Sequence, residues 1–132
     1  EGVDLERPSI PEPRVCIDAA AHDALVAALE PVAEQSYEGD VALRMAQYAR
    51  ELDRRGPRVE AEDLEEASKL VGRPLASWAE ADTALEDVVN REGEARLPEL
   101  LCYFYRRTLR HEALLRPAMR ELTDIEFQTI RL

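Results

Sequence analysis

The chain has 132 residues, 45% of them hydrophobic, and its 28 acids against 17 bases give a net charge of −11. This length is enough for one domain with its own core, and the negative charge opposes binding to nucleic acid and to anionic membranes. No stretch approaches the roughly 18 apolar residues of a membrane span, and no basic-then-apolar leader opens the chain, so we predict a cytoplasmic protein.

The first 17 residues predict an extended, proline-rich arm. Prolines at positions 8, 11 and 13 remove backbone donors and favour extended conformations in the residues before them. The Pro-x-x-P spacing fits a tail or a packed linker better than a polyproline II ligand. We therefore divide the chain into an arm of residues 1–17 and a helical bundle domain of residues 18–132.

Two helices are predicted between the arm and Gly56. Asp18 is the candidate N-cap of the first helix, which Pro31 should bend or end. The apolar stripe of this helix consists of Ala21, Leu25, Ala28 and Val32. Ser36 is the candidate cap of the second helix, which should close at Gly56. Its apolar stripe consists of Val41, Met45, Tyr48 and Leu52.

Further helices are predicted on both sides of Gly72. Residues 59–71 carry acids mostly on one face and apolar residues on the other, and Gly72 suits their C-terminal stop. Ser77 and Glu80 form a capping box ahead of a helix that should end near Gly93. Residues 119–125 permit a short last helix. We therefore predict an all-α, single-domain bundle of five or six helices.

Residues 97–116 predict the long central helix of this bundle. Pro98 fits the first turn, and Pro117 cannot continue the hydrogen-bond ladder. The main apolar face, which we expect to pack into the core, consists of Leu97, Leu101, Phe104, Thr108, His111 and Leu115. A thinner apolar line on the opposite side consists of Cys102, Leu109 and Ala113. A helix with two apolar lines is either central in its own fold or covered by a partner.

Residue types that would build a catalytic or metal centre do not cluster along the sequence. The glycines are isolated, unlike those of a phosphate-binding loop, and Cys16 and Cys102 lack the spacing of a zinc site. Asp18 and His22, one turn apart, are interpreted as a local surface pair. His111 fits a core histidine with a satisfied hydrogen bond better than a general base. We therefore predict no metal, no cofactor and no enzymatic activity.

Positive charge gathers on the long helix, against the trend of the whole chain. Around the helix, Tyr103, Arg106, Arg107 and Arg110 share the side away from Phe104. These arginines pair either with the chain's own acidic face, residues 60–66, or with an acidic partner or a phosphate-bearing ligand. The candidate partner- or phosphate-binding residues are Cys102, Tyr103, Arg106, Leu109, Arg110 and Ala113.

Three stretches carry a family resemblance: LCYFYRRTLRHEALLRP, DVALRMAQYARELDRRG and ASKLVG. The matching positions of the first stretch are Leu101, Arg106, Thr108, Leu109, Ala113, Leu114 and Pro117. Over residues 37–118 the chain resembles small bacterial proteins of uncharacterised-domain type that occur with phosphotransferases of the aminoglycoside-kinase fold and with acyl-CoA dehydrogenases. Among them it is similar to the small accessory subunit of a 4-hydroxyacyl-CoA kinase in levulinate breakdown.

The resemblance implies a noncatalytic accessory subunit that binds and supports a phosphotransferase-family hydroxyacyl-CoA kinase, while the kinase supplies ATP, magnesium and the base. In this interpretation the second face of the long helix meets the kinase, and Arg106 and Arg110 bind its acids or the phosphates of coenzyme A. The alternative class is a freestanding acidic helical protein, of interaction or regulatory type, that occupies a basic site on an unrelated target.

Overall fold

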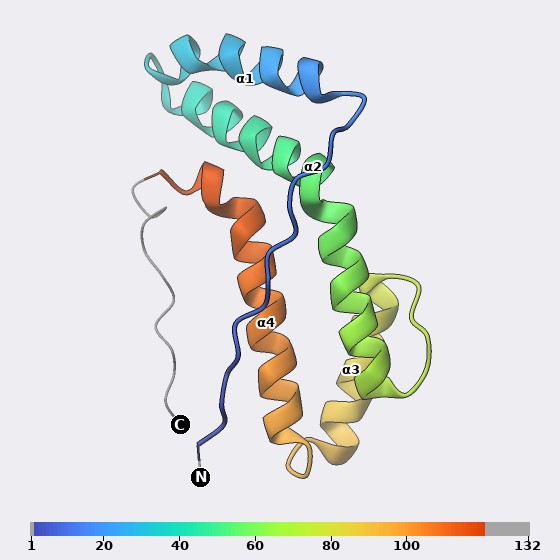
Figure 1. Cartoon of the computed structure of the whole chain (residues 1–132). Coiled ribbons are helices and arrows are strands. Elements are labelled where there is room, and N and C mark those ends of the chain that lie inside the picture. The colour runs from blue at the N-terminus through green and yellow to red at the C-terminus, as the bar shows by residue number, and fades with distance from the viewer. Residues whose placement is uncertain (1, 121–132) are drawn as a thin grey trace. The chain divides into compact units, whose positions relative to one another are not determined.

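The computed structural model of the chain describes residues 2–120, and in that range it contains four α-helices and no β-strand (Figure 1). The helices are α1 (Ala19–Ala33), α2 (Tyr37–Val71), α3 (Trp78–Glu92) and α4 (Leu97–Leu115), and a 3₁₀ turn, η1 (Arg116–Ala118), follows them. The all-α class is therefore confirmed. None of the described helices combines the length and the apolar character that crossing a membrane requires. The short helix expected at residues 119–125 falls mostly outside the described residues.

Within residues 2–120 there are four α-helices where five were expected, because the two helices predicted on either side of Gly56 form one helix, α2. Pro57 lies inside α2 and has no amide hydrogen, so the carbonyl of Asp53 receives no bond from it. The arm supplies the missing donors: Arg14 Nε donates to the Asp53 carbonyl at 3.1 Å, and the Arg14 amide donates to the Arg54 carbonyl at 3.0 Å. The helix therefore continues where the local sequence predicted its end.

Residues 97–116 were expected to form the longest and central helix. They do form α4, which ends at Leu115, but at 35 residues α2 is longer than the 19 residues of α4. The central position belongs to α2, because both compact units of the structure are built on it. This correction follows directly from the continuity of α2 through Pro57.

The described residues form two compact units, and both α2 and α4 contribute to each of them. Unit 1 contains residues 2–10 and Arg58–His111, and unit 2 contains Pro11–Pro57 and residues 112–120. Residues 2–16 hold no helix, in keeping with an extended arm, although the arm is shared between the units. The boundary between arm and bundle at residue 18 stays a prediction.

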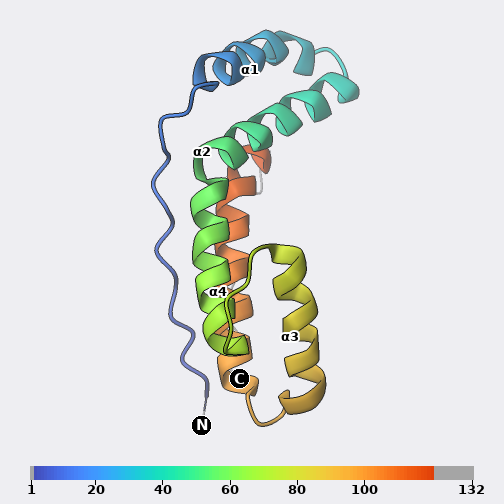
Figure 2. The same cartoon turned by 90° about the vertical axis from the view of Figure 1, so that its right-hand side faces the viewer.

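In unit 1, α3 lies alongside α4 and the C-terminal half of α2 (Figure 2). Their buried side chains form one core, which consists of Ala67, Leu75, Ala81, Ala84, Leu85, Val88, Leu100 and Tyr103. The local signals around this core are confirmed: Gly72 ends α2 with φ +80°, and Ser77 Oγ accepts the Glu80 amide at 3.2 Å. Local sequence therefore sets the ends of the helices in this unit.

The buried face of α4 is not the predicted one. Leu97 and Phe104, which we expected in the core, are 51% and 40% exposed. The side chains that are buried instead are Leu100, Tyr103, Leu109, Arg110 and Leu114. Both faces of the helix carry apolar residues at helical spacing, and α2 offers the buried Asp63 and the half-buried Glu66 to the face that holds Arg110. That pairing allows a charged residue into the interior.

Unit 2 contains a hairpin of α1 and the N-terminal part of α2. The predicted cap forms, because Ser36 Oγ accepts the Gly39 amide at 2.9 Å. Asp18 occupies the N-cap position of α1 without a side-chain bond, and α1 continues past Pro31 to Ala33. His22 does not form the expected local pair; its Nε2 lies 3.4 Å from Asp53 Oδ2 of α2. A contact across the hairpin thus replaces the one predicted along α1.

Candidate functional site

The six candidate binding residues do not share one exposed face of α4. Three of them are buried in the structure: Tyr103, Leu109 and Arg110. The other three are half-buried: Cys102, Arg106 and Ala113. Cys102, Tyr103 and Arg106 line a common cleft, and the remaining three do not line it. Burial of Arg110 corrects the expectation that it faces outward, whereas a role of these residues in partner binding stays a prediction.

Arg110 is the centre of a buried ion-pair network in unit 1. Its side chain is 1% exposed; Nε donates to Asp63 Oδ1 at 2.6 Å, and Nη2 donates to Glu66 Oε2 at 3.0 Å. The Asp63 carboxylate has no exposed surface and also accepts from Trp78 Nε1 at 3.0 Å. His111 Nε2 lies 2.8 Å from Asp63 Oδ2. Every polar atom of this carboxylate therefore has a partner, as burial of a charge requires.

These contacts shift the pKa values within the network. Burial by itself would raise the pKa of Asp63, but hydrogen bonds from His111 and Arg110 bring it below its ordinary value. The pKa of Glu66 is lowered in the same way, since Arg110 and Arg106 outweigh the effect of burial. The pKa of the Arg110 guanidinium is raised, because its two carboxylate partners outweigh desolvation. Asp63, Glu66 and Arg110 are therefore ionised at neutral pH.

Arg106 connects the buried network with the surface of unit 1. Its Nε and Nη2 donate to the same oxygen of Glu66, Oε1, at 3.0 and 2.7 Å. Arg107 points to another helix and pairs with Asp82 of α3. Of the two alternatives for the arginines, pairing with the acids of residues 60–66 is thus present in the structure for Arg106 and Arg110. The hydrogen bond expected of His111 is present, but its side chain is 37% exposed, so the expected core position is wrong.

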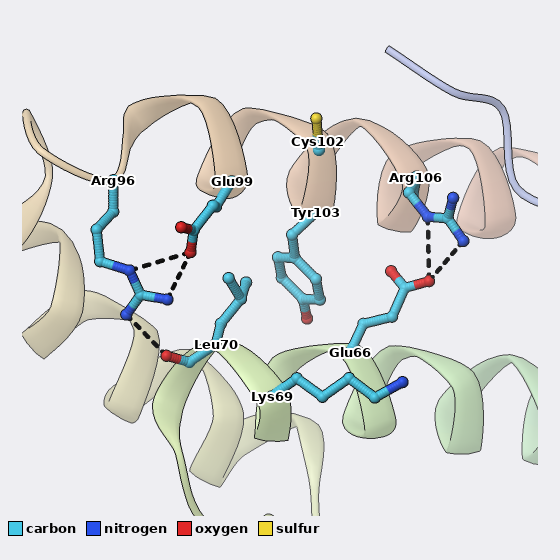
Figure 3. Close-up of a pocket in the computed structure, with 8 residues that line it drawn as sticks. All are labelled: Glu66, Lys69, Leu70, Arg96, Glu99, Cys102, Tyr103 and Arg106. Atoms are coloured by element: carbon cyan, nitrogen blue, oxygen red, sulfur yellow. Dashed lines mark hydrogen bonds and ion pairs between the residues drawn. The ribbon is translucent and has the colours of Figure 1, made fainter. Parts of the chain in front are cut away.

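A cleft of about 350 Å³ opens between α2 and α4, beside Arg106 (Figure 3). Leu70 of α2 and Tyr103 of α4 contribute its apolar surface. Burial raises the pKa of the Tyr103 hydroxyl, so this phenol stays neutral. Cys102 also lines the cleft, and its thiol donates to the Asp4 carbonyl of the arm at 3.6 Å. An apolar middle with charged ends suits a ligand, or a partner side chain, of mixed character.

Ion pairs close both ends of this cleft. The Arg106–Glu66 pair stands at one end, and Arg96 stands at the other. Arg96 Nε and Nη2 donate to Glu99 Oε2 at 3.1 and 2.7 Å, and its Nη1 donates to the Leu70 carbonyl at 2.8 Å. That carbonyl belongs to the last turn of α2, so Arg96 also caps this helix end. Lys69 adds a further positive charge at the rim.

Sequence reasoning missed two important members of this region. Asp63 was assigned to a solvated acidic face, yet it follows buried Val59 by four residues and precedes buried Ala67 by four, which is the spacing of one helix face. Arg96 was not singled out, although Glu99 three residues later is the usual distance of a helical ion pair. Both signals lie within the local sequence, whereas the contacts that Asp63 and Arg96 make with other helices do not.

In the part of the chain that the structure describes, no group of three or more His, Cys, Asp or Glu side chains is placed to hold a metal ion. Comparisons of the chain with protein-family models, with curated proteins and with solved structures found no match.

Proposed function

We propose that this chain is a noncatalytic helical subunit that binds and supports a phosphotransferase-family hydroxyacyl-CoA kinase. The resemblance over residues 37–118 supports the choice of partner. The observation that carries the binding role is the outward apolar line of α4, where Leu97 and Phe104 are 51% and 40% exposed. Contiguous exposed apolar surface is typical of sites that bind other proteins.

The construction of α4 fits a permanent binding surface. Its inner face is fixed by the core around Leu100 and Tyr103 and by the ion pairs of Arg110. The outer face therefore presents Phe104 on a rigid helix, and little conformational entropy is lost when a partner covers it. Aromatic side chains held in this way are frequent anchors of protein interfaces. The proposed partner-facing side is thus the main apolar face of the sequence prediction, while the role expected of the thinner line of Cys102, Leu109 and Ala113 stays a prediction.

The ionisable groups of unit 1 support a noncatalytic role. A general base works best with a pKa near the operating pH, whereas the pKa values of Asp63 and Glu66 are lowered by their arginine partners. The Cys102 thiol donates to the Asp4 carbonyl. In the proposed complex, the kinase supplies ATP, magnesium and the base.

Contact with acyl-CoA phosphates is proposed for the end of the cleft beside Arg106. Arg106 lines this cleft and is half-buried, whereas Arg110 is enclosed by Asp63 and Glu66. Lys69, which is 70% exposed, lies on the same rim. Arg106 and Lys69 are therefore the cations that reach a phosphate from the partner's substrate, and Arg110 serves to hold Glu66 in place.

Co-expression with a phosphotransferase-family hydroxyacyl-CoA kinase tests the proposal. We expect the untagged chain to co-purify with the tagged kinase, and Phe104→Glu to abolish co-purification because it places a charge in the apolar contact. The matched control is Val89→Glu on α3, since Val89 is 44% exposed and lies outside the proposed contact. Both variants should keep the unfolding midpoint of the wild type. Retention of the kinase by Phe104→Glu at wild-type strength would refute the proposal.

The net charge of −11 favours one alternative, a freestanding acidic protein that occupies a basic site on an unrelated target. Salt separates the two functions. Binding through the apolar line of α4 changes little between low and high salt, because apolar contacts are not screened. Binding of acids to a basic target weakens steeply over the same range. Kinase binding that weakens steeply at high salt and is unchanged in Phe104→Glu would favour this alternative.

A further inference from the structure

Unit 2 contains a pocket of about 180 Å³ that is lined by three arginines from two segments of the chain. Arg14 precedes α1, whereas Arg50 and Arg54 lie one turn apart on α2. The rest of the lining consists of Val15, Ala19 and Asp23. Arg14 is held beside α2 because its side chain and its amide donate to the Asp53 and Arg54 carbonyls. The fold thus gathers three guanidinium groups around one small pocket.

These guanidinium groups use few of their donors within the described part of the chain. Each guanidinium has five N–H donors. Arg50 donates one hydrogen bond, to Asp23 Oδ1 at 3.1 Å. Arg54 also donates one, to Glu51 Oε1 at 3.4 Å. The Nε of Arg50 is buried and has no partner among the described residues. In the network of unit 1, by contrast, Arg110 donates three hydrogen bonds. Arg50 and Arg54 therefore retain donors that a ligand can use.

The lining of the pocket is positive, although the chain carries a net charge of −11. Three arginines stand against one carboxylate, Asp23, which leaves an excess of two positive charges. Asp23 is 68% exposed, so water weakens its effect. Two further carboxylates contact the arginines, but both have other partners. Glu51 pairs with Arg55 at 2.7 Å, and Asp53 lies 3.4 Å from His22. The arginines therefore repel one another, and a bound anion would relieve this repulsion.

The start of α1 adds to the positive potential of the pocket. Ala19, the first residue of this helix, is part of the lining. The N-cap residue, Asp18, forms no side-chain hydrogen bond with the first amides of the helix. The positive end of the helix dipole therefore supplements the three arginines, which supply most of the charge.

We propose that this pocket binds a phosphate dianion, either inorganic phosphate or the phosphate group of a small monoester. A tetrahedral phosphate presents acceptor oxygens in several directions, which suits donors from three separate guanidinium groups. A phosphate monoester carries a charge of about −1.5 to −2 at neutral pH, close to the excess of two positive charges. A carboxylate supplies only one negative charge. The pocket has the room of several water molecules, which is enough for a phosphate group.

Calorimetric titration of the full chain with inorganic phosphate, at constant ionic strength, tests the site. We expect saturable binding of one phosphate per chain. Arg54→Gln should bind about tenfold more weakly or worse, because it removes charge-assisted hydrogen bonds. The matched control is Arg91→Gln on α3, which removes an exposed arginine outside the pocket and should bind like the wild type. Circular dichroism verifies that both variants fold. A wild-type chain without saturable phosphate binding would overturn the proposal, and so would wild-type affinity in Arg54→Gln.

Two other anions identify the ligand class. Phenyl phosphate represents a monoester, and acetate represents a carboxylate. Phenyl phosphate that binds at least as tightly as inorganic phosphate would assign the pocket to a monoester. Exclusion of phenyl phosphate would assign it to free phosphate, and either result supports a phosphate site. We expect acetate to bind about tenfold more weakly or worse, because it has one charge and fewer acceptor oxygens. Acetate that binds as tightly as phosphate would overturn the assignment to a dianion.

Nuclear magnetic resonance of the arginine side chains shows where the anion binds. The Arg50 Nε–H signal of the labelled chain is assigned by its absence from Arg50→Gln. On titration with phosphate it should shift with the dissociation constant that calorimetry gives, because the anion supplies an acceptor at this guanidinium. The Arg91 Nε–H signal should stay unchanged. Equal shifts at Arg50 and Arg91 would indicate diffuse attraction of ions and would overturn a defined site.

Discussion

The ion-pair network of unit 1 and the hairpin of unit 2 differ in which residues they bury: the network buries a charged residue, and the hairpin leaves an apolar residue exposed. In unit 1, a charged residue, Arg110, is 1% exposed because Asp63 and Glu66 lie against it. In unit 2, an apolar residue, Met45, is 63% exposed because nothing in the described part of the chain covers it. The polarity of a residue thus determines whether it favours water or the protein interior. Whether it is buried depends on the partners that the fold places beside it.

The two regions also differ in what they do for the chain. The network contributes to the stability of unit 1, since removal of Arg110 leaves the buried Asp63 without its charged partner. The exposed apolar side chains of unit 2, among them Leu25, Val32 and Met45, contribute little to the stability of a single chain, because they gain nothing from burial. Substitutions that separate stability from association therefore sharpen the comparison.

The largest effect is expected at the centre of the network. Arg110→Met should lower the free energy of unfolding by about 3–5 kcal/mol, because Asp63 stays buried without its charged partner. Urea denaturation followed by circular dichroism measures this loss. Arg106→Met is the matched control and should cost clearly less, because Glu66 keeps its bonds to Arg110. Equal losses in the two variants would contradict the central position of Arg110.

The next effect compares the same kind of truncation in the two regions. Leu85→Ala should cost about 2–5 kcal/mol, since Leu85 is 1% exposed in the core of unit 1 and its removal leaves a cavity. Met45→Ala should change the unfolding free energy of the monomer by less than about 0.5 kcal/mol, as for other exposed positions. Urea denaturation of the two variants gives both values. A large loss in Met45→Ala would show that Met45 is covered within the chain.

The smallest effect is a dependence of stability on pH. The pKa values of Asp63 and Glu66 are lower in the folded chain than in the unfolded one, so their contribution is complete above the unfolded pKa values of about 4. It is lost as the pH falls through the lower, folded values. The urea midpoint of the wild type should therefore drop below pH 4, and Asp63→Asn should show a weaker dependence. An equal slope in both proteins would contradict the assignment to Asp63.

The sequence by itself determined the helical class and several helix ends. Ser36, Ser77 and Gly72 act as predicted, because capping bonds and a left-handed backbone position involve residues within about one helical turn. The position of α4 was also predictable from its apolar spacing and from Pro98 and Pro117. Signals of this kind depend on interactions between residues a few positions apart, so they can be recognised from the sequence alone.

The tertiary structure alone decided three further features. The continuity of α2 through Pro57 depends on donors from Arg14, 39 residues before the carbonyl of Asp53 that its side chain reaches. The choice between the two apolar faces of α4 depends on Asp63, which is 47 residues from Arg110. The exposure of Leu25, Val32 and Met45 depends on which elements pack against α1 and α2. In each case the energy comes from contacts between residues far apart in the chain, and helical periodicity carries no information about them.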